Sequence, residues 1–545
     1  MITLPLQIAR RASQEALYAS WAFRRGVIGI DPPWKVAQLG AALWRHGMLG
    51  AIPAMASIRH GRDQAAVIDE LGTMTYGELD DAVNALANHW LSLGLGPGDG
   101  VSILARNHRW FLVATYAAAR CGTRIVLLNT DFAGPQIRDV AAREGTDFLV
   151  HDDEYGDLLA EVGTRLGRLR AWTEDATERG ADTLAGVVAN GDSSPAPRAG
   201  QEPKIVLLTS GTTGTPKGAP RAAEGRSLAP IGALLSKVPF EAKGTVVLPA
   251  PMFHTLGFAQ ALLNGGLGAT LVVRRRFDPA LVLQDLSDHR ATGMVAVPVM
   301  LQKMAELGED AFAEADLTHL KAIFVAGSQL GAELAVRATA LFGPVLHNMY
   351  GSTEVAYATI ATPEDLAAEP GCVGRPVLGT TVKLFDDRGR EVPTGTTGRI
   401  FVGNDFQFEG YTGGGDKDRI DGLMSTGDVG HFDAAGRLFV DGRDDDMIVS
   451  GGENVFPGEI EELLFGHEAV REAAAIGVPD ERFGQRLRAF VVLHDGAELT
   501  ADDVKAYVAG NLARYKTPRD VVFLDELPRN PTGKVLKREL SEREV

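Results

Sequence analysis

The feature that most constrains the fold of this chain is a regular alternation of strand-like and helix-like segments, which begins near residue 64. Short apolar runs such as Val101–Ala105 and Arg124–Leu128 are typical of buried strands. The apolar residues of Trp110–Arg120, which lies between them, instead recur at helical spacing. Thr75-Tyr-Gly-Glu78 has the form of a capping box and predicts the start of an earlier helix. Because helical connections allow strands to pair in parallel, the pattern predicts an α/β protein.

The second half of the chain continues this pattern and then departs from it. A linker-like stretch at residues 191–203 is followed by predicted strands at Ile205–Leu208, Val246–Pro249, Thr270–Val273, Gly293–Val297, Ala322–Ala326 and Val345–Met349. From about residue 380 the pattern changes to hairpins, with turns at Asp386–Gly389 and Asp433–Gly436. The residues after Gly442 are typical of a small α+β domain.

Composition excludes several classes of protein. The chain has 545 residues, of which 45% are hydrophobic and 23% charged, as expected of a globular protein with a full core. Two cysteines, Cys121 and Cys372, are too few for a disulfide framework or a cysteine-rich metal site, and they fit a reducing compartment. A formal net charge of −17 argues against nucleic acid as a partner. No apolar stretch approaches the roughly 20 residues that span a bilayer, so we expect a cytoplasmic protein.

Residues 1–59 differ from the rest of the chain in charge. They contain seven Lys or Arg residues against only Glu15 and Asp31, together with three of the six tryptophans, Trp21, Trp34 and Trp44. Basic residues mixed with tryptophan suit a segment on an anionic membrane surface, which would make the protein peripheral on the inner face of the membrane. A helical extension that packs on its own protein has the same amphipathic pattern. An arginine-rich, acid-poor segment is also typical of a cleaved targeting peptide.

The strongest chemical motif is Thr209-Ser-Gly-Thr-Thr-Gly-Thr-Pro-Lys-Gly218, which directly follows a predicted buried strand. Its glycines let the backbone curl and bring amide groups close to oxyanions. The hydroxyl groups of Thr209, Ser210, Thr212 and Thr213 can donate hydrogen bonds to phosphate oxygens, and Lys217 adds a mobile positive charge. The usual P-loop instead has Gly before its Lys and Ser or Thr after it. The motif therefore predicts a phosphate-binding loop of another kind.

This segment resembles the phosphate loop of the adenylate-forming superfamily, which comprises acyl-CoA synthetases and other AMP-dependent ligases. The resemblance extends over about residues 60–545. It implies an AMP-binding N-terminal domain over residues 60–442, with two αβα layered subdomains and a small β-barrel-like subdomain. A small mobile α+β C-terminal domain would follow over residues 443–545, and residues 1–59 would form an extension. The implied ATP-binding residues of the loop are Thr209, Ser210, Gly211, Thr212, Thr213, Gly214, Thr215, Pro216 and Lys217, of which Lys217 is also implied as catalytic.

Two further motifs of the family follow in order. In Tyr350-Gly-Ser-Thr-Glu354, the resemblance implies nucleotide contacts from Tyr350, Gly351, Ser352, Thr353 and Glu354, with the tyrosine ring against adenine. Glu354 is implied as a catalytic residue and, with Thr209, as a ligand of Mg²⁺, which prefers carboxylate and phosphate oxygens. Ser425-Thr-Gly-Asp428 resembles the family's ribose-binding segment. The chemistry agrees with this role, because the Asp428 carboxylate can accept two hydrogen bonds from the ribose diol. Leu423 and Met424 stand where many relatives have an aromatic pair.

The segment from Gly442 to Glu461 resembles the family's interdomain hinge. Arg443 is implied as a ribose or phosphate ligand and Asp445 as the hinge residue. Gly451 and Gly452 are implied beside the path of the pantetheine arm of coenzyme A, where absent side chains leave room, although a tight turn between a strand and a helix has the same glycine pair. Pro528-Arg-Asn-Pro-Thr-Gly-Lys534 resembles the terminal catalytic motif, and Lys534 is implied to contact the acyl carboxylate and the α-phosphate.

The resemblance also implies an acyl site. His254 follows a predicted strand, and relatives often have a histidine here, close to the acyl carboxylate, although a single histidine at a strand end is often structural. Ala326, Gly327 and Gly351 match positions that line the acyl pocket, and Gly327 is also implied beside the nucleotide. Their small side chains either leave a long channel open or permit tight packing.

These motifs predict an AMP-forming acyl-CoA synthetase that uses ATP, Mg²⁺ and coenzyme A. A medium- or long-chain fatty acid is favoured as the carboxylic acid substrate by the basic, tryptophan-containing extension and the small pocket residues. An aryl-CoA ligase is an alternative, because the hinge segment also resembles that of benzoate-type ligases. A second alternative delivers the acyl-adenylate to a carrier protein. A third is a nucleotide-binding scaffold without activity, against which Lys534, Glu354 and Asp428 argue.

Overall fold

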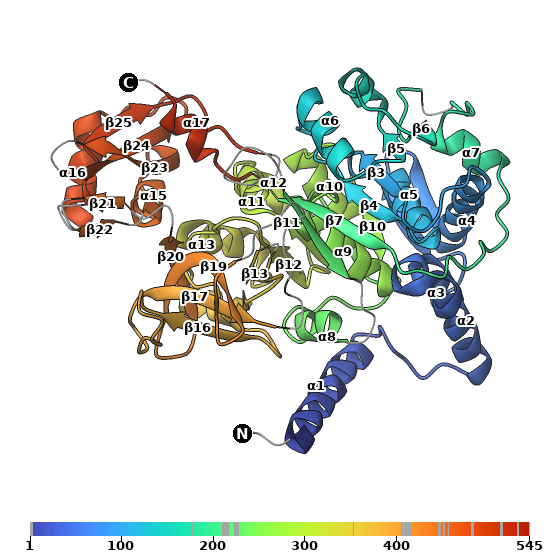
Figure 1. Ribbon diagram of the computed structural model, residues 1–545. Helices are drawn as coiled ribbons and strands as arrows, with labels where there is room; N and C mark the ends of the chain where they lie inside the picture. Colours follow the sequence, from blue (N-terminus) through green and yellow to red (C-terminus); the bar gives the residue numbers. More distant parts are fainter. Residues whose placement is uncertain are drawn as a thin grey trace. The chain divides into compact units, whose positions relative to one another are not determined.

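The computed structural model describes residues 4–175, 178–209, 217–222, 228–352, 354–404, 407, 417–444, 448–450, 453–455, 457–480, 484–512, 516–530 and 533–543. The chain divides into two compact units. Unit 1 comprises Met1–Ala296, Glu306–Phe324 and Asp405–Asp416, and unit 2 comprises Val297–Ala305, Val325–Asn404 and Lys417–Val545. Strands and helices alternate along much of unit 1 (Figure 1).

A mostly parallel sheet forms one layer of unit 1, with its strands in the order β6-β5-β3-β4-β7-β8. The strands are β3 (Gly100–Leu104), β4 (Arg124–Leu127), β5 (Phe148–His151), β6 (Gly167–Arg170), β7 (Lys204–Thr209) and β8 (Lys217–Ala222). All neighbours pair in parallel except β7 and β8. Every residue of β3 is buried, as expected of an apolar strand in a sheet that is covered on both faces.

A second series of strands in unit 1 has the order β12-β11-β9-β10-β1-β2. The strands are β1 (Ala65–Asp69), β2 (Gly72–Thr75), β9 (Thr245–Val247), β10 (Thr270–Val272), β11 (Gly293–Ala296) and β12 (Ala322–Val325). Parallel pairing joins β11, β9, β10 and β1, whereas β2 forms an antiparallel hairpin with β1. Helix α5 (Arg109–Arg120) contacts strands of both series, whereas α4 (Tyr76–Ser92) packs on α5 and on β1 and β2.

The start of α4 confirms the predicted capping box. Thr75 Oγ1 accepts a hydrogen bond from the Glu78 amide at 3.2 Å, and Glu78 Oε2 accepts one from the Thr75 amide at 2.7 Å. The remaining helices in this part of unit 1 are α3 (Ile52–His60), α6 (Gly134–Arg143), α7 (Leu184–Asn190), α8 (Ala229–Leu235), α9 (Thr255–Gly266), α10 (Pro279–Asp288), α12 (Gly308–Ala313) and the 3-10 helix η1 (Asp153–Leu159).

The N-terminal extension begins with α1 (Leu4–Arg24), which packs on α8 of the same unit (Figure 1). Tyr18 of α1 is buried, and a Cβ at Gly232 of α8 would lie only 2.5 Å from the Tyr18 Cα. The predicted alternative of an extension that packs on its own protein is therefore confirmed for α1. Helix α2 (Pro33–Gly50) follows and is kinked at Gly47. In the described part of the chain, no helix is both long and apolar enough to cross a membrane.

Unit 2 contains antiparallel structure. Its strands β13 (Leu346–Tyr350), β14 (Thr359–Ala361) and β15 (Arg375–Pro376) pair antiparallel in this order. A second sheet has the order β16-β17-β19-β18, with β20 on β19; its strands are β16 (Thr381–Phe385), β17 (Gly398–Gly403), β18 (Arg419–Ile420), β19 (Leu423–Phe432) and β20 (Leu438–Arg443). Both predicted hairpins are confirmed, since β16 pairs antiparallel with β17 and β19 with β20. The helices of this region are α11 (Pro298–Ala305), α13 (Ala332–Phe342) and α14 (Pro363–Ala368).

The C-terminal part of unit 2 is a small α+β structure, as predicted. Its sheet has the order β22-β21-β24-β23, with β25 on β24; the elements are β21 (Ile448–Ser450), β22 (Glu453–Val455), α15 (Pro457–Phe465), β23 (Val470–Asp480), β24 (Gly484–Leu493), α16 (Ala501–Asn511), β25 (Asp520–Phe523) and α17 (Lys537–Ser541). Side chains alternate between two cores along β24: Ala489 and Val491 belong to one core, Phe490 and Val492 to the other.

The mixed α/β class, with a large N-terminal part and a smaller C-terminal part that contains a sheet, is thus confirmed. The domain boundaries at residues 60 and 443 stay predictions.

Candidate active site

The predicted phosphate loop connects β7 and β8 of unit 1. These strands form an antiparallel hairpin in which Thr209, the last residue of β7, lies opposite Lys217, the first residue of β8. The pairing therefore holds the backbone at the two ends of the motif side by side. The residues between them, Ser210, Gly211, Thr212, Thr213, Gly214, Thr215 and Pro216, lie outside the described residues, as do the side chains of Thr209 and Lys217.

Tyr350 and Asp428, which belong to different motifs, form a hydrogen-bonded pair in unit 2. Tyr350 is the last residue of β13, and its Oη donates to Oδ2 of Asp428 at 2.6 Å. The same hydroxyl lies 3.0 Å from Oγ1 of Thr426. Burial, together with the neighbouring Asp428 carboxylate, raises the pKa of Tyr350 well above its ordinary value. Tyr350 is therefore a neutral donor at every physiological pH.

Asp428 also faces two positive charges. It lies opposite Arg443 in the pairing of β19 with β20, and Nε of Arg443 is 3.6 Å from Oδ1 of Asp428. Burial raises the pKa of Asp428, while the hydrogen bond from Tyr350 and the charges of Arg443 and Lys534 oppose that rise. The Lys534 ammonium is thus close enough to act on this carboxylate. Three predicted nucleotide-binding residues from three separate motifs therefore lie together, and the charge of Lys534 acts on the carboxylate among them.

Lys534 extends from a tight turn with an exposed side chain. Its backbone amide donates to Oδ1 of Asn530 at 2.9 Å, and the Asn530 amide donates to the Lys534 carbonyl at 2.9 Å. The preceding Gly533 has φ +77, and a Cβ there would overlap Cγ1 of Val299 in α11. Only glycine fits this position, because both the left-handed backbone and the contact with Val299 exclude a side chain.

The backbone of the segment after Tyr350 is fixed by close packing and by hydrogen bonds. A Cβ at Gly351 would overlap the carbonyl oxygen of Ala356, so the chain can fold back here only at a glycine. Oγ of Ser352 accepts hydrogen bonds from the amides of Glu354 and of the next residue, at 3.2 and 3.4 Å. Asn404 Nδ2 donates to the carbonyls of residues 355 and 357, at 2.8 and 2.9 Å. Sequence reasoning missed Asn404, which has no motif around it; Thr353 lies outside the described residues.

The donor groups of Glu354 and Thr209 fit magnesium. Mg²⁺ prefers hard oxygen ligands and commonly takes only one or two from protein, the rest coming from phosphates and water. Among the residues that the structure describes, no group of three or more His, Cys, Asp or Glu side chains could hold a metal ion by itself. The Glu354 carboxylate is a hard oxygen ligand of the kind that Mg²⁺ prefers.

His254 lies in unit 1 as the N-cap residue of α9. Its Nε2 is shielded from solvent and has no hydrogen-bond partner within the described ranges, and its ring contacts that of Phe253, with 4.6 Å between ring centroids. Burial lowers the pKa of His254 to about 4. The imidazole is therefore neutral at neutral pH, so it can meet a carboxylate as a hydrogen-bond donor but not as a cation.

The other predicted acyl-site residues lie in unit 2. Ala326 is buried directly after β12, and Gly327 has φ +101 with Cγ1 of Val297 3.4 Å from its Cβ position. A larger residue at position 327 would be strained by its backbone before it filled any pocket.

The predicted hinge and pantetheine residues, Asp445, Gly451 and Gly452, lie outside the described residues. The residue before the hinge is well held: the Asp444 amide donates to the Gly427 carbonyl at 2.9 Å, and its carboxylate accepts from Nε of Arg399 at 2.9 Å. Strand β21 (Ile448–Ser450) follows the hinge segment.

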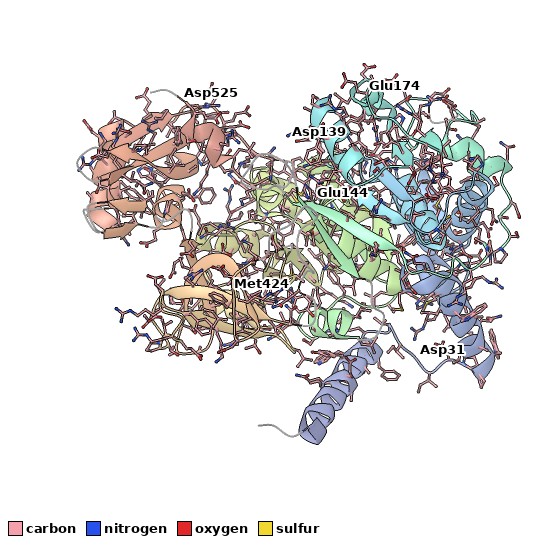
Figure 2. The ribbon with its side chains drawn as sticks, in the orientation of Figure 1. Asp31, Asp139, Glu144, Glu174, Met424 and Asp525 are labelled. Atoms are coloured by element: carbon pink, nitrogen blue, oxygen red, sulfur yellow. The ribbon has the colours of Figure 1, made fainter. Side chains whose placement is uncertain are left out.

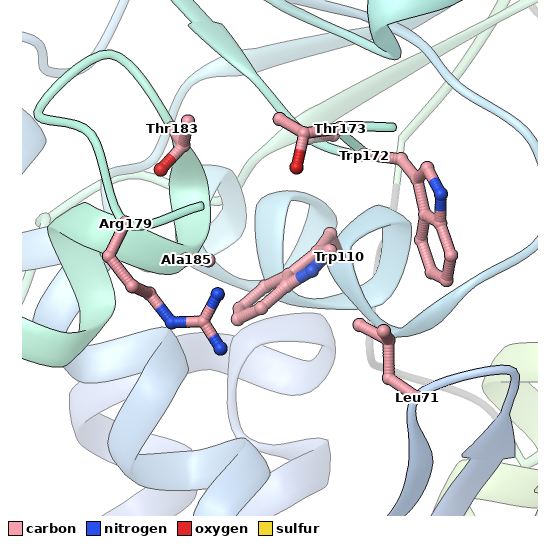
Figure 3. A pocket seen from close by; sticks show the side chains of 8 residues that line it. Leu71, Trp110, Trp172, Thr173, Arg179, Thr183 and Ala185 are labelled. Carbon is pink, nitrogen blue, oxygen red and sulfur yellow. The ribbon is translucent and has the colours of Figure 1, made fainter. Parts of the chain in front are cut away.

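A small cavity in unit 1 lies apart from these motifs. Figure 3 shows the Arg179 guanidinium beside the ring of Trp110, with Trp172 and the hydroxyl groups of Thr173 and Thr183 around it. Its volume of about 20 Å³ is enough for water but not for a substrate.

Comparison with known proteins agrees with this fold and this order of motifs. The family model described as AMP-binding enzyme matches residues 56–412, and that described as AMP-binding enzyme C-terminal domain matches residues 459–534. Fatty acid–[acyl-carrier-protein] ligase ScoC of Streptomyces coeruleorubidus is 32% identical, over 89% of this chain and 94% of its own length. Feruloyl-CoA synthase of Amycolatopsis sp is 33% identical, over 90% and 96%. The crystal structure of ATP-bound MatB from Rhodopseudomonas palustris covers 90% of this chain and 98% of its own, with a TM-score of 0.79 and 27% identity.

The fold and the ordered motifs define an enzyme that activates a carboxylic acid with ATP. The chain belongs to the AMP-binding enzyme family. It is an AMP-forming acid–thiol ligase, an acyl-CoA synthetase that uses ATP, Mg²⁺ and coenzyme A.

Proposed function

We propose that this protein activates a medium- or long-chain fatty acid and transfers the acyl group to coenzyme A. The observation that carries the proposed mechanism is the group formed by Tyr350, Asp428, Arg443 and Lys534, because it joins a neutral donor, a ribose acceptor and two cations. The proposed acid is supported by the small side chain of Ala326 and by the basic extension with its three tryptophans. The name of the ScoC relative, a fatty acid ligase, points the same way.

In the first proposed step, a carboxylate oxygen of the acid attacks the α-phosphorus of ATP, and the bond to the bridging oxygen breaks as pyrophosphate leaves. Asp428 accepts hydrogen bonds from the ribose hydroxyls, and the Tyr350 ring lies against adenine. Lys217 and Lys534 stabilise the negative charge that collects on the phosphate oxygens and offset the repulsion between two anions. Glu354 and Thr209 would hold Mg²⁺, which supplies further neutralisation of the phosphates.

In the second proposed step, the coenzyme A thiolate attacks the acyl carbon. The bond from that carbon to the phosphate oxygen breaks, and AMP leaves as an anion, so the step needs no further proton. Gly451 and Gly452 border the pantetheine arm, and His254, Ala326, Gly327 and Gly351 surround the acyl group. Asp445 is the proposed pivot that lets the C-terminal domain serve both steps.

Two alternatives each have a specific observation in their favour. An aryl acid is favoured by the 33% identity to a feruloyl-CoA synthase, and a carrier-protein acceptor by the 32% identity to a ligase named for an acyl carrier protein. The two relatives differ in both acid and acceptor although their identities to this chain are nearly equal. The substrate must therefore be decided by assay.

The deciding experiment is AMP release from short, medium and long straight-chain acids, a branched acid, benzoate and ferulate, each with and without coenzyme A. We expect AMP release to rise with chain length and to depend on coenzyme A. Turnover of the aromatic acids alone would reverse the substrate proposal. Acyl transfer to a phosphopantetheine-bearing carrier protein, with coenzyme A inactive, would favour the carrier alternative, and no acid-dependent AMP release with any acid would contradict the whole proposal.

We also propose that the protein works peripherally on the inner face of the membrane, through residues 1–59. Long-chain acids partition into bilayers, so an enzyme held at the surface would meet its substrate there. The support is the excess of basic residues and the three tryptophans of this extension.

A further inference from the structure

The two long N-terminal helices differ in how they are held. In α1, Tyr18 is buried against α8, and Oε2 of Glu15 accepts a hydrogen bond from the Leu228 amide at 3.2 Å. Nε of Arg25, directly after α1, donates to the Leu235 carbonyl at 3.3 Å. Helix α1 is therefore committed to its own unit along this side.

Helix α2 carries an exposed apolar stripe. The stripe consists of four exposed residues, Trp34, Ala37, Ala41 and Trp44. They are spaced by three, four and three residues. Because an α-helix turns about 100° per residue, this spacing places all four within about 80° of one another. The two tryptophan side chains are 60% and 64% exposed. The buried Ala42 and His46 face the other way. A large apolar face thus points away from the unit.

Exposed apolar side chains are concentrated in the N-terminal extension rather than scattered over the protein. In the described part of the chain, thirteen large hydrophobic side chains are exposed, and eight of them lie between Leu17 and Met48. The most exposed of all is Ile30, at 93%, in the connection that leads into α2. Single exposed hydrophobic residues are ordinary, whereas a cluster of this kind marks an interaction site.

Basic side chains lie beside the stripe, and the two acidic residues of the extension are engaged elsewhere. Asp31, labelled in Figure 2, forms an ion pair with Arg59 at 3.4 Å, and Glu15 is engaged with α8. Arg45 is exposed beside the stripe. The Arg198 guanidinium stands over the Trp44 ring, 4.9 Å from its centroid. Tryptophan at the edge of an apolar face with arginine around it suits the interface of a bilayer that carries negative charge.

We propose that the outer face of α2, with Ile30 ahead of it, docks in the plane of an anionic lipid surface. The stripe enters the boundary between headgroups and acyl chains, and Arg45 and Arg198 contact lipid phosphates. This inference rests on the proposed peripheral contact and narrows it from 59 residues to one helix face. It also assigns α1 to the protein side of the extension.

The test is co-sedimentation of the full chain with vesicles of phosphatidylglycerol and phosphatidylcholine, compared with phosphatidylcholine alone. We expect binding to the mixed vesicles, weakened by salt. Trp34→Ser with Trp44→Ser should weaken it at least about tenfold, because the main apolar contact is lost. Ala41→Glu should do the same from the middle of the stripe. Arg45→Gln should weaken binding to the anionic vesicles about fivefold.

Matched controls come from other exposed positions. Val336→Ser removes an apolar side chain that is 56% exposed on α13, and Arg388→Gln removes an exposed arginine in the β16–β17 connection. Both should leave vesicle binding unchanged. A second measurement uses Trp34→Phe with Trp44→Phe, which should still bind while losing most of the quenching of tryptophan emission by brominated acyl chains.

Unchanged binding of the double serine variant would overturn the proposal, as would a wild-type chain that ignores anionic vesicles. A double serine variant that changes the mass in solution but not vesicle binding would assign the stripe to a second copy of the chain instead. Lys534→Ala should lose acid activation and still bind vesicles, so that failure of the lipid proposal and failure of the proposed function are distinguishable.

Discussion

At the scale of single residues, the hydrogen bond between Tyr350 and Asp428 couples two contacts that the sequence predicts separately. The residues are 78 positions apart, and their side chains meet at 2.6 Å. The tyrosine that is proposed to lie against adenine also lowers, through its hydrogen bond, the pKa of the carboxylate that is proposed to bind ribose. Adenine and ribose recognition are therefore expected to fail together.

Tyr350→Phe tests this coupling. The substitution removes a hydrogen bond that lowers the pKa of Asp428, so that pKa rises. Because ribose binding needs the carboxylate, the acid limb of kcat/KM for ATP should move to higher pH, and activity should be lost earlier as pH falls. At neutral pH we expect KM for ATP to increase about tenfold, as for the loss of one hydrogen bond to a charged group. The measurement is the pH profile of acid-dependent AMP release.

Tyr507→Phe, in α16, is the matched control and should leave the profile unchanged. An acid limb of Tyr350→Phe that coincides with that of the wild type would show that the hydrogen bond does not control Asp428. The motif residues themselves were readable from the sequence because each has distinctive neighbours. Asn404 was not, because its task is to bind the backbone at residues 355 and 357, which leaves no pattern in the sequence.

At the scale of elements, helix α13 begins without a cap of its own. Its N-cap residue is Gly331, which has no side chain to accept a hydrogen bond. Instead, Oε1 of Glu462 in α15 accepts one from the Ala332 amide at 3.0 Å. A carboxylate at a helix N-terminus satisfies a free amide and interacts favourably with the helix dipole. The cap therefore stabilises the arrangement in which α15 lies against α13.

We predict that Glu462→Ala weakens this arrangement by about 1 kcal/mol, the usual effect of losing a cap. Since Lys534 acts on Asp428 in the same arrangement, the variant should slow carboxylate-dependent ATP–pyrophosphate exchange about fivefold. It should not slow attack of coenzyme A on supplied acyl-adenylate. Glu462→Gln keeps an acceptor and should be intermediate. Glu468→Ala, at an exposed position nearby, is the control, and equal slowing of both reactions by Glu462→Ala would contradict the assignment.

Helices and strands were predicted well where the hydrophobic periodicity and the capping residues lie close together in the sequence. The capping box at Thr75 and the strands β3, β4 and β7 follow from residues within a few positions of one another, so their existence was correct and only their ends moved. The Glu462 cap was not predictable, since its two partners are 130 positions apart. The packing of α1 on α8 was open for the same reason: Glu15 and Leu228 meet across 213 positions.

At the scale of the whole molecule, two half-reactions share one adenylate, and Lys534 is proposed to serve only the first. In the structure, the charge of Lys534 acts on Asp428 of the same unit. The sequence predicted this lysine from its motif. It did not predict where the lysine lies in the folded protein, because the same motif is present in every conformation of the C-terminal domain. For residues 1–59, the structure shows α1 packed on its own unit and the outer face of α2 exposed, and membrane contact stays a proposal.

Lys534→Ala should reduce carboxylate-dependent ATP–pyrophosphate exchange more than about a hundredfold, because it removes a charge aimed at the developing negative charge on phosphorus. Attack of coenzyme A on supplied acyl-adenylate should be nearly unchanged. Lys505→Ala, a lysine of α16, should affect neither reaction. Equal loss of both half-reactions in Lys534→Ala would show that the lysine holds the adenylate throughout rather than assisting its formation.

The missing side chain at Gly533 has a consequence for how the rate of this enzyme can be tuned. One methyl group there would press on Val299 and displace the backbone that carries Lys534. Substitution at this position is therefore expected to slow acid activation through the backbone alone, while the side chains proposed to contact ATP, acid and thiol all stay in the sequence.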